Sequence, residues 1–416
     1  MTEVLAPRKN NIIMKMFYYW GILILWQWVR PVANRSLADV LVKVGMFLIF
    51  ILYAQKHKKV RKEDNWLLWL SLFLGTQIIT ILFDSGERDM GSIISTVFIF
   101  VQIIVFLVLI SDDTIYESEL ERFCKIIIVV VLFMAIYNMI FSTSRFLQAF
   151  SSSGGRYGSE CKSFLYSNHE FGIYLATGII IAFWMALRGK LKYWQMFVIN
   201  AILGANLFAT YSRTAILGTV AAVFVLLFFY KKNVFLITLV TFAIVVAIIY
   251  ANPTTRNIVF DKVLKGTFEN GQIMDENRSE MYDDEWYGFT SADLFKQFFG
   301  YGYAGKWEFG GHNGYLQILL TGGIFMFAFF IGIILISIRY SFKTIRINRS
   351  LGSLMLGFQV FALLYMVAQT AILFYSTMDS FFITMTAILI PKYIYNHEVL
   401  RIGIPKEETT DEDHSD

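Results

Sequence analysis

Apolar runs long enough to cross a membrane recur along the chain, and they constrain its fold more than any other feature. A membrane-spanning helix needs a run of about 17–25 residues. Of the 416 residues, 56% are hydrophobic and only 16% are charged, against roughly 25% charged in a typical soluble domain. A soluble core could not hide so much apolar surface, so the sequence predicts an all-α polytopic membrane protein.

About twelve stretches qualify as spans, and short connections join most of them. They are expected to form one bundle over residues 1–395, because no long linker divides them. A charged tail without apolar residues follows over 396–416, and its composition predicts disorder. The expected spans are 12–29, 37–54, 66–83, 91–110, 123–141, 171–187, 195–210, 214–230, 234–250, 313–337, 351–375 and 381–395.

The charges on the connections predict the orientation of this bundle. The start of the chain has basic residues before an apolar stretch but no small-residue cleavage site, so we expect a retained first helix. Alternate connections carry an excess of Lys and Arg, and such an excess marks the cytoplasmic side. Both termini are therefore expected in the cytoplasm, and the long connections 142–170 and 251–312 outside it.

The second long connection is expected to carry secondary structure of its own. Its stretch "NRSEMYDDEWYGFTSADLFKQFF" mixes aromatic and acidic residues at roughly helical spacing, which predicts short helices lying over the bundle. The glycines of "FGYGYAG" then predict a break before the next span. This stretch resembles a dinucleotide-binding loop only superficially, because no strand precedes it.

Neither a metal nor a cofactor is expected. Cys124 and Cys161 form no disulfide framework or metal-binding pattern. The chain contains no HExxH motif and no CxxC motif. No nucleic-acid partner is expected either, because the net charge of +4 reports membrane orientation in a chain of this class.

Three arginines fall on the predicted outer side. Arg213, in "TYSRTAILG", lies in a short turn between two spans; it is either an arginine snorkelling at a helix end or a functional group at the lip of the membrane. Arg278 is either a solvated charge paired with a neighbouring acid or a ligand for an anion. Arg156, beside a Gly-Gly turn, is open to the same two interpretations.

His312 and Asn313 begin a predicted span on the same side, in "GGHNGYLQILLTGG". A neutral imidazole accepts a proton near neutral pH, so His312 is a candidate general base. Asn313 either supports it or caps the helix. His169, in "YSNHEF", could simply cap its own helix. The remaining histidines, His57, His397 and His414, lie in predicted cytoplasmic segments.

Arginines and a histidine at the outer surface suit a substrate with a lipid tail and a phosphate head. Guanidinium groups bind phosphate oxygens with two parallel hydrogen bonds and keep their charge at any relevant pH. Stabilising a pyrophosphate leaving group is electrostatic work that arginines can do without a metal. The histidine could then take the proton of an attacking hydroxyl group.

The order of these motifs resembles the O-antigen ligase and Wzy-type polysaccharide polymerase superfamily. The matching segments are "YSRTAILG", "NRSEMYDDEW" with "LFKQFFGYGYAG", and "GGHNGYLQILLTGGIFMF". The stretch "RYGSECKSFLYSNHEFGIYLA" is similar to an upstream family segment, but it has Ser167 and His169 on either side of Asn168. The resemblance covers roughly residues 156–335.

The resemblance implies an inverting, metal-independent glycosyltransferase of the bacterial cytoplasmic membrane, acting on its outer face. Its partners would be an undecaprenyl-pyrophosphate-linked glycan donor, an acceptor, membrane lipid and a chain-length regulator. Arg213 and Arg278 would hold the pyrophosphate and His312 would activate or orient the acceptor. Arg156, Asn313 and Tyr211 are further candidates for substrate binding.

Four functions remain open on the sequence. A polymerase joins lipid-linked repeat units into a surface polysaccharide such as O-antigen or capsule, whereas a ligase moves the finished glycan to lipid A core. A flippase or transporter would place its ionisable residues near the membrane midplane, and a structural membrane partner leaves the His312 segment unexplained. The abundance of Lys, Ile, Asn and Phe indicates an AT-rich genome, which many capsulated bacteria without lipid A share, and so favours polymerase.

Overall fold

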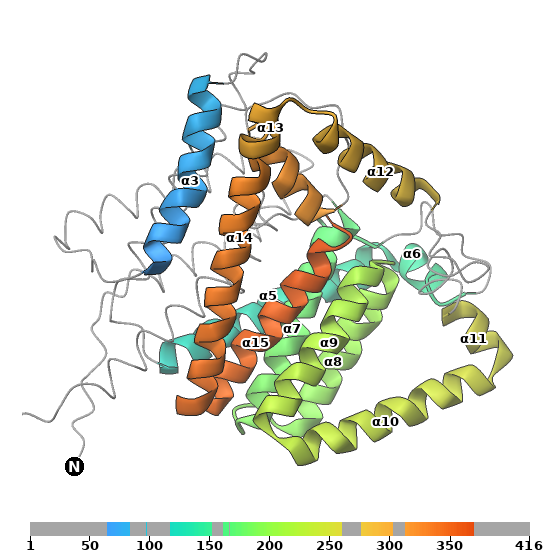
Figure 1. The fold of residues 1–416 in the computed structure, drawn as a ribbon. Helices are drawn as coiled ribbons and strands as arrows, with labels where there is room; N and C mark the ends of the chain where they lie inside the picture. Colours follow the sequence, from blue (N-terminus) through green and yellow to red (C-terminus); the bar gives the residue numbers. More distant parts are fainter. Residues whose placement is uncertain are drawn as a thin grey trace, which may run out of the picture.

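The described part of the chain is helical. The computed structural model describes residues 65–83, 97, 117–151, 161–165, 167–259, 276–302 and 313–369, and these contain no strand (Figure 1). Four of the expected spans lie outside the described residues: 12–29, 37–54, 381–395 and, apart from Val97, 91–110.

Eight long helices and four short ones make up the described residues. The long helices are α3 (Asn65–Phe83), α5 (Glu117–Phe141), α7 (Asn168–Leu187), α8 (Tyr193–Ala209), α9 (Arg213–Tyr230), α10 (Lys232–Ala251), α14 (Gly314–Ile347) and α15 (Arg349–Met366). The short helices are α6 (Thr143–Gln148), α11 (Pro253–Val259), α12 (Glu276–Thr290) and α13 (Leu294–Phe299). Among the described residues, 6 helices are long and apolar enough to cross a membrane, which confirms an all-α polytopic membrane protein.

The helix boundaries differ from expectation in three places. α5 begins at Glu117, so part of the expected connection before it is helical. α14 continues to Ile347 rather than ending near residue 337, and only Asn348 separates it from α15. α15 ends at Met366 in a turn, not near residue 375. The connection 251–312 carries short helices, as the sequence predicts, whereas α6 in the connection 142–170 was not predicted.

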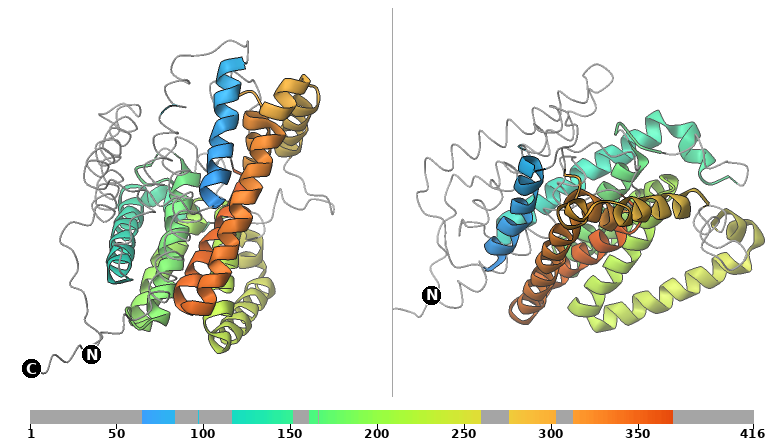
Figure 2. Two further views of the ribbon diagram at one scale, coloured as in Figure 1. Left: turned by 60° about the vertical axis from the view of Figure 1, so that its left-hand side comes forward. Right: turned by 45° about the horizontal axis from the view of Figure 1, so that its top comes forward.

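α7 lies at the centre of the bundle. It is almost entirely buried and packs against α5, α8, α9 and α15, as the views in Figures 1 and 2 show. It supplies three of the largest buried side chains, Trp184, Tyr174 and Phe171. Gly172 and Gly178 let neighbouring helices approach α7 closely, because a Cβ on either would lie 3.0 Å or less from a neighbouring side chain. By contrast, α10 has no buried residue and diverges from the bundle after its start against α9.

Buried polar side chains join neighbouring helices. Asn138 on α5 donates to Asn206 on α8 (2.9 Å). Gln359 on α15 bridges two serines of α14: its amide donates to Ser337 (2.8 Å), and Ser341 donates to its oxygen (2.9 Å). Interhelical hydrogen bonds of this kind fix the pairing of helices where lipid and interior are equally apolar.

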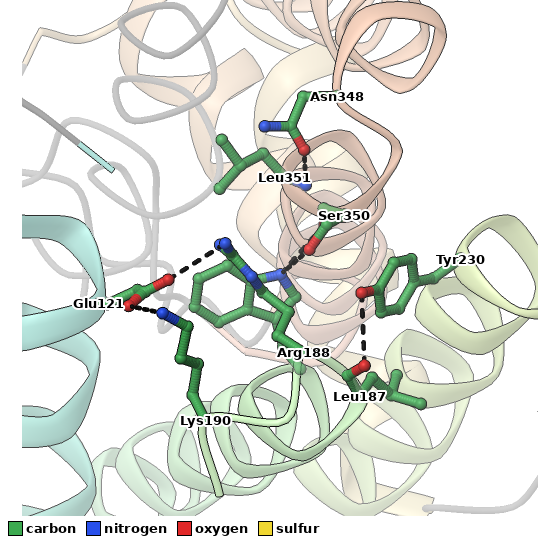
Figure 3. Close-up of polar contacts among 9 residues, drawn as sticks. Glu121, Leu187, Arg188, Lys190, Tyr230, Asn348, Ser350 and Leu351 are labelled. Atoms are coloured by element: carbon green, nitrogen blue, oxygen red, sulfur yellow. Dashed lines mark hydrogen bonds and ion pairs between the residues drawn. The ribbon is translucent and has the colours of Figure 1, made fainter. Parts of the chain in front are cut away.

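At the end of the bundle expected in the cytoplasm, polar contacts fasten the helix ends (Figure 3). Glu121 on α5 forms ion pairs with Arg188 (3.1 Å) and Lys190 (3.0 Å), which follow α7. The Trp184 indole donates to the hydroxyl of Ser350 on α15 (2.9 Å), and the Arg188 guanidinium lies over the Trp184 ring. This end is tied together, and it lies at the opposite end of α7 from His169.

Glycines allow two backbone segments to meet near the start of α14. The helix is broken at Gly323 (φ 66°, ψ −168°). The segment after α13 docks there, because Tyr301 N–H donates to Leu320 O and Gly302 N–H to Thr321 O, both at 2.8 Å. A Cβ on Gly323 would lie 2.3 Å from the Phe298 carbonyl oxygen. Figure 2 shows α13 at this end of α14.

We expect Gly323→Ala to destabilise the protein strongly. A left-handed backbone costs a residue with a Cβ about 1–2 kcal/mol, and relieving the overlap with Phe298 adds about 1–3 kcal/mol. Thermal unfolding of the detergent-solubilised protein measures the effect. Gly204→Ala on α8 is the matched control, because a Cβ there meets nothing within 4 Å. Equal unfolding temperatures for both variants would contradict the docking.

Candidate functional site

The candidate site lies where several helix ends meet, at the end of the bundle away from the contacts of Figure 3. The N-termini of α7, α9 and α14 and the C-terminus of α15 come together there, and α12 packs against α14 (Figure 1). Polar contacts run from the Arg213 turn to Gln369, and the Gln369 backbone lies close to the start of α14.

Arg213 follows an unusual backbone turn. Tyr211 has a positive φ of 56°, and Ser212 (φ −81°, ψ 85°) sits in an inverse γ-turn closed by a bond from Arg213 N to Tyr211 O (3.1 Å). The Tyr211 side chain is 3% exposed and packs with Phe146 and Cys161. The buried Tyr211 side chain thus holds the turn in place, and Arg213 follows as the first residue of α9.

Side chains at the N-terminus of α7 form hydrogen bonds with this turn. Asn168 donates from its side-chain amide to Thr210 O (2.8 Å). The Nδ1 atom of His169 lies 3.3 Å from the Ser212 hydroxyl oxygen. The cap of α7 is Ser167, whose hydroxyl accepts from the backbone N–H groups of His169 and Glu170. The interpretation of His169 as a capping residue was therefore wrong, because its ring is turned toward α9.

The C-terminal end of α15 approaches the same imidazole. The Gln369 amide nitrogen lies 3.1 Å from His169 Nδ1, and the Tyr365 hydroxyl donates to the His169 carbonyl (3.1 Å). A Cβ on Gly314 would lie 3.1 Å from the Gln369 carbonyl oxygen. Gln369 therefore stands between the Arg213 turn and the start of α14.

Asn313 caps α14. Its side-chain oxygen accepts from Tyr315 N (2.9 Å) and Leu316 N (3.2 Å), which confirms one of the two roles that the sequence left open. Any contact with substrate would have to use its amide nitrogen. His312, the residue before it, lies outside the described residues, and so does Arg156.

Arg278 belongs to the first turn of α12. One turn later, the Tyr282 hydroxyl donates to Val367 O (3.3 Å), just beyond the end of α15. At its far end α12 is held by the Tyr301 hydroxyl, which donates to Gly288 O (3.2 Å). These bonds bring the first part of α12, with Arg278, to the same end of the bundle as Arg213.

Ionisable groups around the site show no arrangement typical of a metal centre. Within the described residues, no group of three His, Cys, Asp or Glu side chains could hold a metal ion. Burial raises the pKa of the Cys161 thiol, which keeps it protonated and unreactive. The backbone N–H of Lys296 lowers the pKa of Asp293, because the carboxylate caps α13.

Comparison with known proteins agrees with the motifs. Residues 198–331 match the model of a family described as O-antigen ligase, and this segment runs from α8 into α14 and includes Arg213, Arg278 and His312. No curated protein matches the chain. The match indicates an enzymatic role in glycan transfer and, together with the long apolar helices, a bacterial membrane protein. Over residues 198–331, this chain is therefore similar to the family described as O-antigen ligase.

Proposed function

We propose that this protein polymerises undecaprenyl-pyrophosphate-linked oligosaccharide units into a surface polysaccharide. The observation that carries the proposal is the chain of contacts at the helix ends: Ser212 to His169, His169 to Gln369, and Gln369 to Gly314. These contacts link the residue before Arg213 with the start of α14, next to His312. In this proposal Arg213 is the anion-binding arginine, and His312, which precedes Asn313 in the chain, is the base.

The reaction is a single displacement at the anomeric carbon. The acceptor hydroxyl oxygen attacks this carbon while the bond between the carbon and the pyrophosphate oxygen breaks. The configuration at the anomeric carbon inverts. The pyrophosphate leaves with the bonding electrons, and Arg213 and Arg278 stabilise its negative charge. His312 takes the proton of the attacking hydroxyl. Arg156 and the side-chain amide nitrogen of Asn313 support binding of the donor. Tyr211, expected to bind substrate, has a buried side chain and supports binding only by shaping the turn before Arg213.

A ligase would use the same donor site, so the acceptor separates the two functions. The purified protein is reconstituted with a lipid-linked repeat unit as sole substrate. We expect a ladder of products that lengthens by whole repeats. Absence of elongation until lipid A core is added would replace polymerase by ligase. Uptake of the lipid-linked unit into sealed vesicles without any new glycosidic bond would favour a transporter.

The proposed orientation predicts which positions a membrane-impermeant maleimide reaches from outside. Both native cysteines are buried and can stay in place. A cysteine at Tyr287 on α12, which is 69% exposed, should react in intact cells. A cysteine at Lys192, exposed before α8, should react only after permeabilisation. The reverse labelling pattern would place the candidate site in the cytoplasm and overturn the proposed roles.

A further inference from the structure

His169 stands at the junction of three helices but belongs to none of the proposed catalytic steps. It lies at the start of α7, its ring contacts Ser212 at the start of α9, and Gln369 beyond α15 contacts the same ring nitrogen. Gly172, one turn further along α7, lets α7 and α9 approach closely, since a Cβ there would lie only 3.0 Å from the Ala215 Cβ.

The donor groups next to the His169 ring indicate which ring nitrogen carries the proton. A glutamine amide nitrogen can only donate a hydrogen bond. With Gln369 Nε2 at 3.1 Å, this contact is a hydrogen bond when Nδ1 of His169 accepts, that is, when the ring is neutral with its proton on Nε2. The Ser212 hydroxyl lies 3.3 Å from the same nitrogen and can turn its hydrogen toward it. Nδ1 is thus an acceptor that two helices share.

Ser212 connects this acceptor to the arginine. It is 1% exposed and forms the centre of the γ-turn from which Arg213 leaves. Its backbone N–H is held by the Thr210 hydroxyl (3.1 Å), and Thr210 O is held by Asn168. The Ser212 hydroxyl also contacts His169. A change in the backbone dihedrals of the turn would therefore break at least one of these buried contacts of Ser212.

We propose that His169 is a positioning residue for Arg213: its Nδ1 atom accepts hydrogen bonds from Ser212 and Gln369 and so fixes the turn that aims the guanidinium at the donor pyrophosphate. This inference rests on the proposed function. Misplacing a binding group by about 1 Å can cost roughly 10²-fold in rate, so the effect should appear in the transfer reaction.

Two amide substitutions separate the ring nitrogens. The side-chain oxygen of asparagine is as many bonds from the backbone as Nδ1, whereas that of glutamine matches Nε2. Transfer from a lipid-linked donor is measured for His169→Asn and His169→Gln at equal membrane accumulation. We expect His169→Asn to stay close to wild type and His169→Gln to lose about 10- to 100-fold.

Three results would overturn the proposal: wild-type rates for both variants, loss in both, or rescue by glutamine alone, which would mean that Nε2 does the work. Should His169→Gln fail to accumulate, Gln369→Leu decides, because it removes the donor from the other side. Gln369→Leu should impair transfer, and adding Ser212→Ala should cost less than the two single losses multiplied; a fully multiplicative double variant overturns the proposal.

The same assay separates this inference from the proposed function. Arg213→Lys and His312→Ala are measured alongside the His169 variants. If these two stay active, the proposed site itself is wrong. If they are inactive while His169→Gln transfers at the wild-type rate, only the positioning role of His169 fails.

Discussion

His312→Ala should abolish glycan transfer while the protein still inserts and accumulates in the membrane. The residue directly precedes Asn313 in the chain, and the Asn313 side chain caps α14. Loss of a general base costs about 10²–10⁴ in rate. Alanine leaves the cap intact, because both capping bonds are made by Asn313.

Transfer from a lipid-linked donor, measured in membranes with equal amounts of protein, tests this expectation. Asn313→Asp is the matched control for the helix start, because aspartate caps a helix about as well as asparagine does. Its accumulation should equal that of wild type. Normal product from His312→Ala at equal expression would reduce His312 to a packing residue.

Arg213→Lys should also impair transfer severely, by about 10²–10³-fold, the loss found when one preorganised donor to a developing anion is removed. Lysine keeps the positive charge but presents a single ammonium point, which cannot replace two parallel bonds to pyrophosphate. The turn before Arg213 is fixed by Tyr211 and Ser212. The backbone therefore cannot shift to bring the lysine ammonium of Arg213→Lys into the position of the guanidinium. Arg278→Lys should behave in the same way.

Arg256→Lys provides the control for these arginine substitutions. Arg256 lies on α11, in the same connection (251–312) as Arg278, and its guanidinium lies over the Tyr250 ring. An exposed contact of this kind contributes about 0–1 kcal/mol, so the transfer rate of this variant should be close to wild type. Equal rates for Arg213→Lys, Arg278→Lys and Arg256→Lys would remove the proposed pyrophosphate clamp.

Local patterns made much of the fold predictable from the sequence. Apolar length located α3, α7, α8, α9 and α10 to within a few residues, since membrane helices need that length. The Asn313 cap and the helix break at Gly300 were also predictable, because both depend on residues next to them in the chain. The kink at Gly323 was not, since it depends on a segment that precedes Gly323 by about twenty residues in the chain.

The site was predictable only where its residues carry a local signal. Arg213 stands out as a charge between two apolar runs. The role of His169 depends on Ser212 and Gln369, which are 43 and 200 residues away in the chain, and no spacing rule joins them. A clue was present in the departure from the family pattern around Asn168, where His169 stands beside the asparagine. The fold turns that departure into a contact with the Arg213 turn.

The most direct expectation is that this chain itself breaks a glycan–pyrophosphate bond and makes a glycosidic bond. Purified protein in lipid nanodiscs is given an undecaprenyl-pyrophosphate-linked oligosaccharide and a chelator of divalent metals, and released undecaprenyl pyrophosphate is counted against new linkages. We predict one undecaprenyl pyrophosphate for each bond formed, with inverted anomeric configuration and no effect of the chelator. Intact donor after prolonged incubation, or transfer that stops with the chelator and returns with added metal, would contradict the account.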